Sequence, residues 1–115
     1  MKIANANITI NVNNLDNSIL FYESIGLTLK KRWENFYVQM VTVGVEIGLQ
    51  PNEKSNSIKG SGNLSIGFTI DNFEEAKSFL QNVGIEEIDR SEVGGQFLHF
   101  SDPDGTALYF IKPKG

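Results

Sequence analysis

The sequence predicts an α+β fold made of two βαβββ modules, and two observations lead to this prediction. The first is an internal repeat: a shift of 58 positions aligns ITINV at 8–12 with IGFTI at 66–70 without a gap. The second is a change of period within each copy, from the alternation of a strand to helical spacing. Three strand-like runs then follow each helix. The chain is therefore expected to form curved mixed sheets around a cleft, with the helices on the outer faces.

The repeat also predicts where both helices begin and end. Asn14 is a suitable N-cap for the first helix, and Asp71 with Glu74 has the pattern of a capping box for the second. Gly26 and Gly84 align with each other and lie where a C′ glycine is expected.

The strand-like runs after the helices complete the two modules within one domain. We expect module 1 at 1–50, a linker at 51–62 and module 2 at 63–115. Asp102-Pro103-Asp104-Gly105 predicts a hairpin between the last two strands, because proline fixes φ and glycine accepts the left-handed conformation. The bland role for both carboxylates is to bond nearby backbone amides. The predicted runs are 28–33, 36–43 and 45–50 in module 1, and 85–90, 96–101 and 106–112 in module 2.

Each predicted sheet has one apolar face and one face of polar or small residues. A helix covers only one face of a sheet, so the apolar face should pack on the helix. The other face must meet water, a ligand or its counterpart, and it is the candidate binding site. The residues expected to face the helices are Ile8, Ile10, Val12, Ile47, Leu49, Ile66, Phe68, Ile70, Leu108 and Phe110.

Composition excludes several classes of protein. The 115 residues include no cysteine, which rules out disulfides and thiolate chemistry. A net charge of −4 without a basic stripe argues against nucleic-acid binding. No apolar run approaches the length of a membrane span, and the first residues do not have the pattern of a signal peptide. The expected location is therefore cytoplasmic.

Three segments carry a resemblance to a known family: ITINVNNLDNSILFYESIGL at 8–27, GNLSIGFTIDNFEEA at 62–76 and FSDPDGTALYF at 100–110. They resemble the vicinal oxygen chelate superfamily, which includes glyoxalase I, extradiol dioxygenases, and fosfomycin- and bleomycin-resistance proteins. The resemblance covers most of the chain. It implies that the acidic turn is part of the scaffold and positions Tyr109, the inward residue beyond it.

In metal-dependent members of that family, four strand positions supply His, Glu or Gln ligands to one divalent ion. The resemblance places these positions at Asn7, Gly48, Ser65 and Tyr109. By strand alternation, all four lie on the sheet face that the helix does not cover, called the helix-free face below. None is a good ligand, because hard or borderline divalent ions prefer carboxylates and imidazoles. We therefore expect no metal and no cofactor, as in metal-free members of the bleomycin-resistance type.

Other side chains on the helix-free faces are candidates for binding or chemistry. Glu46 is a candidate general base, although a solvated strand glutamate is the more ordinary interpretation. His99 is the only histidine, and a lone histidine is more often structural than catalytic. Tyr109 completes the candidate catalytic residues. The expected ligand-binding residues are Asn7, Thr9, Trp33, Tyr37, Glu46, Gly48, Ser65, Gly67, His99 and Tyr109.

Two functions remain open at this point. The first is a metal-free protein that binds a small molecule, such as an antibiotic or a metabolite, without chemistry. The second is a lyase, isomerase or dioxygenase-like enzyme that uses acid and base residues or an atypical metal site. A structural or regulatory partner domain is a third reading, since fold does not fix function. Exposed sheet edges also predict a homodimer.

Overall fold

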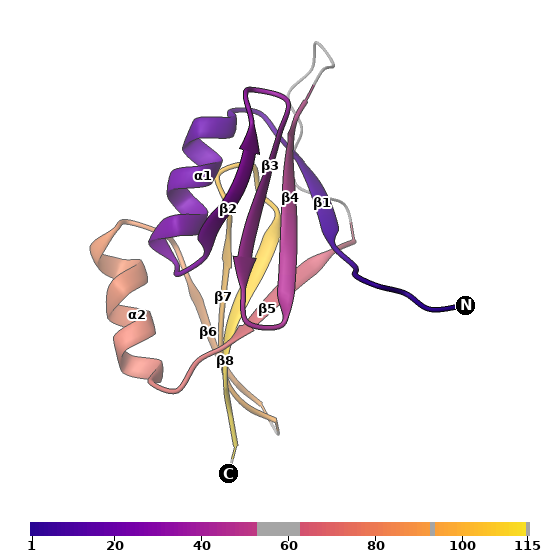
Figure 1. Ribbon diagram of the computed structural model, residues 1–115. Coiled ribbons are helices and arrows are strands. Elements are labelled where there is room, and N and C mark those ends of the chain that lie inside the picture. Colours follow the sequence, from indigo (N-terminus) through magenta and orange to yellow (C-terminus); the bar gives the residue numbers. More distant parts are fainter. Residues whose placement is uncertain (53–62, 93, 115) are drawn as a thin grey trace. The chain divides into compact units, whose positions relative to one another are not determined.

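The computed structural model describes residues 1–52, 63–92 and 94–114. It divides into two compact units, Met1–Ile58 and Lys59–Gly115. Each unit has the element order βαβββ, as the repeat predicts (Figure 1). The elements are β1 (Ile8–Val12), α1 (Leu15–Ser24), β2 (Thr28–Trp33), β3 (Tyr37–Thr42), β4 (Val45–Pro51), β5 (Ser65–Thr69), α2 (Phe73–Asn82), β6 (Ile88–Glu92), β7 (Gly95–Ser101) and β8 (Ala107–Pro113).

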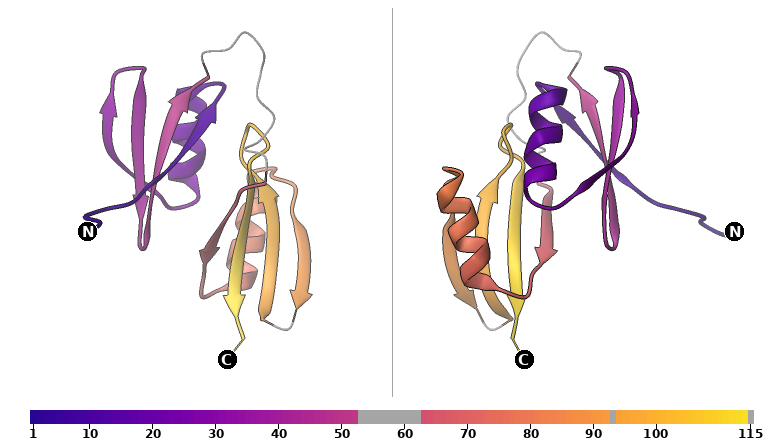
Figure 2. Two further views of the ribbon diagram at one scale, coloured as in Figure 1. Left: turned by 90° about the vertical axis from the view of Figure 1, so that its right-hand side faces the viewer. Right: turned by 60° about the vertical axis from the view of Figure 1, so that its left-hand side comes forward.

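Both units contain a four-stranded mixed sheet with the same topology. The strand order is β1-β4-β3-β2 in unit 1 and β5-β8-β7-β6 in unit 2. The first strand of each unit pairs in parallel with the last, and the remaining pairs are antiparallel. Each helix lies on one face of its own sheet (Figure 2), where α1 contacts β2 and β4, and α2 contacts β8. The predicted α+β architecture is confirmed.

The helix ends agree with the predictions except at one cap. The Asn14 side chain accepts a hydrogen bond from the backbone N–H of Asn17 at 2.9 Å, as expected of an N-cap. The predicted cap at Asp71 is wrong. The cap of α2 is Asn72, 58 residues after Asn14, and its side chain accepts from the N–H of Glu75 at 3.0 Å. Asn72 has the extended backbone that an N-cap requires, so Asp71 lies one residue outside the helix.

Both helices end in the same glycine motif. Gly26 and Gly84 have φ values of 113° and 76°, a left-handed region that a residue without Cβ enters at little cost. The N–H of Leu27 donates to the carbonyl of Tyr22, and Gly26 donates to Glu23. Ile85 repeats the first bond in unit 2, with Leu80 as its acceptor. The predicted C′ glycines are confirmed as Schellman caps.

The acidic turn between β7 and β8 is a structural hairpin. Oδ1 of the buried Asp102 accepts hydrogen bonds from the backbone N–H groups of Asp104 and Thr106, each at 2.9 Å. Gly105 has φ 89° and donates to the carbonyl of Asp102. This bonding gives Asp102 the scaffold role predicted for it.

Most of the residues predicted to face the helices form the core. Ile10, Val12, Ile47 and Leu49 are at most 2% exposed, and Leu108 is 1% exposed. Ile8 differs, with 36% exposure at the start of an edge strand. Phe68 and Ile70 are half-buried.

The predicted strand bounds are right within about two residues, except in β6. That strand is Ile88–Glu92 rather than 85–90, because Ile85 bonds back to the helix end instead of entering the sheet. Phe36 and Val43, predicted within a strand, lie exposed at its two ends. Most of the predicted linker at 51–62 lies outside the described residues, and Pro51 belongs to β4. Neither described helix is long and apolar enough to cross a bilayer.

Candidate functional site

The helix-free face of unit 1 is built around Gly48, in the middle of β4. Thr9 of β1 and Gln39 of β3 are its cross-strand neighbours. The side chain of Tyr37 reaches over this glycine, and a Cβ at residue 48 would collide with the Tyr37 hydroxyl and lie 2.6 Å from its Cζ. The Tyr37 and Thr9 hydroxyls are 3.1 Å apart and share a hydrogen bond. Gly48 therefore provides the space in which a tyrosine ring rests.

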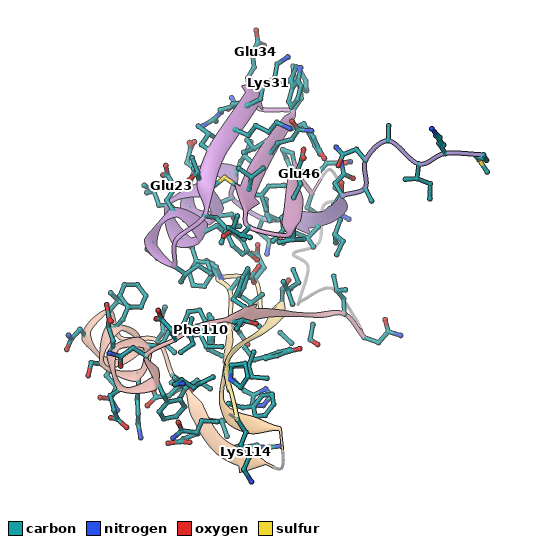
Figure 3. The ribbon with its side chains drawn as sticks, turned by 60° about the horizontal axis from the view of Figure 1, so that its bottom comes forward. Glu23, Lys31, Glu34, Glu46, Phe110 and Lys114 are labelled. Atoms are coloured by element: carbon teal, nitrogen blue, oxygen red, sulfur yellow. The ribbon has the colours of Figure 1, made fainter. Side chains whose placement is uncertain are left out.

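Aromatic and charged groups extend this face toward the β2–β3 hairpin. The ring of Trp33 lies 5.6 Å from that of Tyr37 and is 39% exposed. Nζ of Lys31 lies 4.7 Å above the indole, a favourable cation–π position. Figure 3 shows Lys31 and Glu34 at the tip of this hairpin, with Glu46 labelled nearer the middle of the unit.

Glu46 is the buried charged residue of this face. It lies two residues before Gly48 on β4 and is 8% exposed. Its Oε2 atom is 3.3 Å from Nζ of Lys30, whereas Oε1 has no hydrogen-bond partner among the residues that the structure describes. The sequence pattern missed Lys30 as a partner. The strand register shifts between Leu29 and Lys31, around Lys30. Strict alternation of side chains along a strand does not predict such a shift.

Unit 2 has a corresponding pairing of glycine and tyrosine. Gly67 on β5 lies opposite Tyr109 on β8, and a Cβ at residue 67 would collide with the Tyr109 ring. His99 of β7 is the other neighbour of Tyr109, with ring centroids 5.7 Å apart. The ring of Phe97 stacks on that of His99, with centroids 6.1 Å apart, and its centroid lies 6.0 Å from that of Tyr109. These three half-buried rings form an aromatic row on the helix-free face.

The predicted binding residues thus fall into two groups, one in each unit. Thr9, Tyr37, Gly48 and Trp33 lie in contact with at least one other member of the unit 1 group. Gly67, His99 and Tyr109 do so in unit 2. Asn7 precedes β1 and Ser65 begins β5, and both are exposed. Phe97 was missed, although it shares the strand parity of His99.

The donor set does not fit the divalent ion of the metal-dependent family members. Of the four positions to which the resemblance assigns ligands, Asn7 and Ser65 are neutral, and Tyr109 is a phenol that lies on Gly67. The fourth, Gly48, has no side chain, and Tyr37 fills the space where one would begin. Within residues 1–52, 63–92 and 94–114, no three His, Cys, Asp or Glu residues come together in a way that could hold an ion.

Solved structures similar to the chain share this fold at low identity. A hypothetical protein of S. aureus is 18% identical, with 96% of this chain and 97% of that chain covered and a TM-score of 0.77. A putative glyoxalase family protein of Bacillus anthracis is 21% identical, with 99% of both chains covered and a TM-score of 0.74. A genomically encoded fosfomycin resistance protein of Listeria monocytogenes, complexed with Mn(II) and 1S,2S-dihydroxypropylphosphonic acid, is 18% identical, with 98% and 93% covered and a TM-score of 0.81.

None of the proteins with a curated function matches the chain. The profile of one family does match, over residues 5–110, and this range includes both units almost completely. The chain belongs to the Glyoxalase/Bleomycin resistance protein/Dioxygenase superfamily.

Proposed function

We propose that this protein binds a small organic molecule on the helix-free faces of its sheets without a resident divalent metal. Sequestration of an antibiotic or a metabolite is the role that such binding would serve. The observation that carries the proposal is the tyrosine ring on Gly48, because it occupies the position where the family's metal ligand would begin. The resemblance implies that members with the metal have a His, Glu or Gln ligand at such a position.

The side chains on both faces suit ligand binding. Trp33, Tyr37 and Tyr109 combine flat apolar rings with polar tips, and His99 adds a further ring. Binding sites for small molecules typically pair such apolar surface with a few placed polar groups. Thr9 provides a hydroxyl beside the ring of Tyr37.

An enzyme that uses acid and base residues is the second candidate, and Glu46 is the observation that favours it. A buried carboxylate oxygen without a hydrogen-bond partner is a suitable acceptor for a substrate proton. In unit 2, the candidate groups for such a lyase or isomerase are His99 and Tyr109, whose ring centroids are 5.7 Å apart. Turnover of a bound compound, abolished by Glu46→Gln while binding persists, would establish this function in place of simple binding.

The test of binding uses two signals that the sequence makes unique. The chain has one tryptophan and one histidine, so Trp33 reports on unit 1 and His99 reports on unit 2. We expect compounds from a metabolite and antibiotic library to shift the indole N–H of Trp33 or the ring protons of His99 in NMR spectra. A library that shifts neither signal would contradict the proposal.

A matched pair of variants locates binding on the unit 2 face. Ser65 is exposed at the start of β5, and Ser78 is exposed on α2. Ser65→Phe should abolish the ligand-induced shift of His99, because the added ring covers the helix-free face. Ser78→Phe adds the same group on the helix and should leave that shift unchanged. Equal effects of the two substitutions would show that ligands do not use this face.

The similar fosfomycin resistance protein is complexed with Mn(II), and this protein is expected to differ from it in metal binding. We expect calorimetric titration with Mn(II), Ni(II) or Zn(II) to show no stoichiometric tight site. We also expect fosfomycin with Mn(II) to remain unchanged in phosphorus NMR spectra over many hours. One tightly held ion per chain, or hydration of fosfomycin, would overturn the metal-free proposal.

A homodimer is a separate part of the proposal. β1 and β2 are the edge strands of the unit 1 sheet, and β5 and β6 are those of unit 2. Exposed edges favour pairing with another strand. Sedimentation velocity at micromolar concentration should therefore give the mass of a dimer, and a monomer under these conditions would exclude it.

A further inference from the structure

The Oε1 atom of Glu46 is a buried acceptor that the described part of the protein does not use. Glu46 is 8% exposed, and its Oε2 atom lies 3.3 Å from Nζ of Lys30. The neighbour across the β3–β4 pairing is Val41, whose side chain has no hydrogen-bond donor. A buried carboxylate oxygen without a donor is costly, because it has lost water and gained nothing in return.

The fold itself does not require a carboxylate at this position. Gly48 lies opposite Thr9 in unit 1, as Tyr109 lies opposite Gly67 in unit 2. Two residues earlier on the same strands, Glu46 of unit 1 therefore corresponds to Ala107 of unit 2. Alanine occupies the corresponding sheet position in unit 2. A role other than folding therefore explains better why unit 1 has a glutamate there whose buried Oε1 lacks a hydrogen bond.

Glu46 lies at one end of a strip of groups suited to a flat ligand. Residues two apart on one face of a strand are roughly 6–7 Å apart, so Glu46 lies about one ring's length from Gly48. Gly48 is covered by the ring of Tyr37, whose hydroxyl bonds that of Thr9. Trp33 follows at 5.6 Å from Tyr37. A ligand along this strip would meet a carboxylate oxygen at one end and aromatic rings at the other.

The ion pair with Lys30 decides which ligand group suits Oε1. The ammonium group already offsets the negative charge of the carboxylate, so a second cation would meet the repulsion of Lys30. An uncharged N–H or O–H group supplies the missing hydrogen bond without adding charge.

We propose that Oε1 of Glu46 accepts a hydrogen bond from an uncharged N–H or O–H group of an aromatic ligand bound to unit 1. This inference rests on the proposed binding function and names the ligand class for the unit 1 face. The ligand's ring lies toward Tyr37 and Trp33, and its donor group points to Glu46.

Three matched ring compounds test the donor. Benzyl alcohol has an uncharged O–H donor, benzyl methyl ether has none, and benzylammonium has a charged donor. Titrated at millimolar concentrations, benzyl alcohol should shift the indole N–H of Trp33 and the backbone amide of Glu46. The ether and the ammonium compound should bind at least about 5-fold more weakly, a difference typical of one hydrogen bond. Equal binding by the alcohol and the ether, or no response of Trp33 to the alcohol, would overturn the inference.

Two variants show whether Glu46 is the acceptor. Glu46→Ala, which installs the residue of the corresponding unit 2 position, should bring the alcohol down to the affinity of the ether. Lys30→Met leaves the acceptor in place but removes the offsetting charge, so the preference should move toward benzylammonium. If the alcohol keeps its advantage in Glu46→Ala, another group is the acceptor and the inference is wrong.

The melting temperature measured without ligand tests whether Glu46 has a purely structural role. If Oε1 serves to bind a ligand, Glu46→Ala should not lower the melting temperature of the ligand-free protein, because the change removes a buried group that lacks a hydrogen bond. A loss of more than about 5 °C would show that Glu46 supports the fold and would overturn the inference. Shifts confined to His99 would also overturn it, while leaving the proposed binding function intact.

Discussion

The helix-free faces of the two units differ in chemistry although their sheets have the same topology. Unit 1 has Thr9, Gly48 and Glu46, with the ring of Tyr37 reaching over from β3. Unit 2 has Tyr109 on the strand that corresponds to β4 and Gly67 on the one that corresponds to β1. In each unit a tyrosine ring rests on a glycine, but the two residues come from different strands.

The difference shows that one backbone arrangement supports two kinds of surface. The unit 1 face offers a carboxylate, two hydroxyls and an exposed indole. The unit 2 face is a row of three rings, those of Phe97, His99 and Tyr109. The unit 2 residue that corresponds to Glu46 is Ala107. On these faces, unit 1 therefore presents more polar groups and unit 2 presents more aromatic rings.

Substitutions on the helix-facing sides of the sheets, where the two units are alike, should lower the free energy of unfolding most. Leu98 of β7 and Val38 of β3 occupy corresponding positions, and both are fully buried. Leu98→Ala should lower the free energy of unfolding by about 2–5 kcal/mol, through lost burial and a cavity. Val38→Ala removes one carbon fewer and should cost about 2 kcal/mol. Urea unfolding of both variants measures the difference, and a more costly Val38→Ala would mean that the two cores pack differently.

The tyrosine–glycine pairs should give the next largest effects. Gly48→Ala must displace the ring of Tyr37 and weaken its hydrogen bond to Thr9, at a cost of about 1–3 kcal/mol. Because Trp33 contacts that ring, its fluorescence should change. Gly67→Ala must displace Tyr109 by a similar argument, and the ring protons of His99 should shift.

A matched control keeps this prediction specific. Ala107→Ser also adds an atom to a small side chain on β8, but Ala107 is exposed, so no ring should move. The stability, the Trp33 fluorescence and the ring-proton signals of His99 should stay close to those of the parent protein. If Gly48→Ala left Trp33 fluorescence and stability unchanged, the ring of Tyr37 would not rest on the glycine.

The helix caps should give smaller and nearly equal effects. Asn14→Ala and Asn72→Ala each remove one side-chain acceptor from a helix N-terminus. Each substitution should lower the free energy of unfolding by about 1 kcal/mol, the usual value for a lost N-cap. Asp71→Ala is the control and should cost much less, since Asp71 lies outside the helix. A larger effect of Asp71→Ala than of Asn72→Ala would restore the original capping prediction.

Sequence alone was sufficient for the fold because the pattern is repeated and local. Alternating apolar residues fixed the helix-facing sides, and Gly26 and Gly84 marked the helix ends through their need for positive φ. The cap of α2 was missed by one residue because Asp71 and Asn72 are both capping residues, and only backbone geometry separates them.

The candidate site was less accessible to sequence reasoning because its contacts join residues on different strands. Strand parity placed Gly48 and Thr9 on one face, and the family resemblance put Tyr37 at its border, but neither could show that the ring lies over the glycine. The ion pair of Lys30 with Glu46 arises beside a register shift that has no clear sequence signal. The ligand itself leaves no direct pattern in the chain.

The smallest predicted effect concerns the ion pairs that join each helix to an edge strand. Arg32 of β2 pairs with Asp16 of α1 at 2.8 Å, whereas Lys77 of α2 pairs with Asp89 of β6 at 3.0 Å, so the charges are reversed. The hydrogen bond from Lys77 to Asp89, supported by the charge of that carboxylate, raises the pKa of Lys77 above 10.5. A raised lysine pKa stabilises the fold fully below 10.5, and this contribution is lost as the pH rises through the folded value.

The pH dependence of this pair can be measured against the unit 1 pair, because an arginine keeps its charge in this range. Lys77→Met should be slightly less stable than the parent at pH 8, by a small amount because surface ion pairs are screened. The difference in urea midpoint should shrink as the pH is raised above 10.5, where the parent loses the same charge. Arg32→Met should keep a constant deficit over this range, and Lys2→Met, on the exposed N-terminal segment, should show no deficit. A Lys77→Met deficit that stays constant through this range would show that the pair stabilises unit 2 by packing of the lysine stem and not by charge.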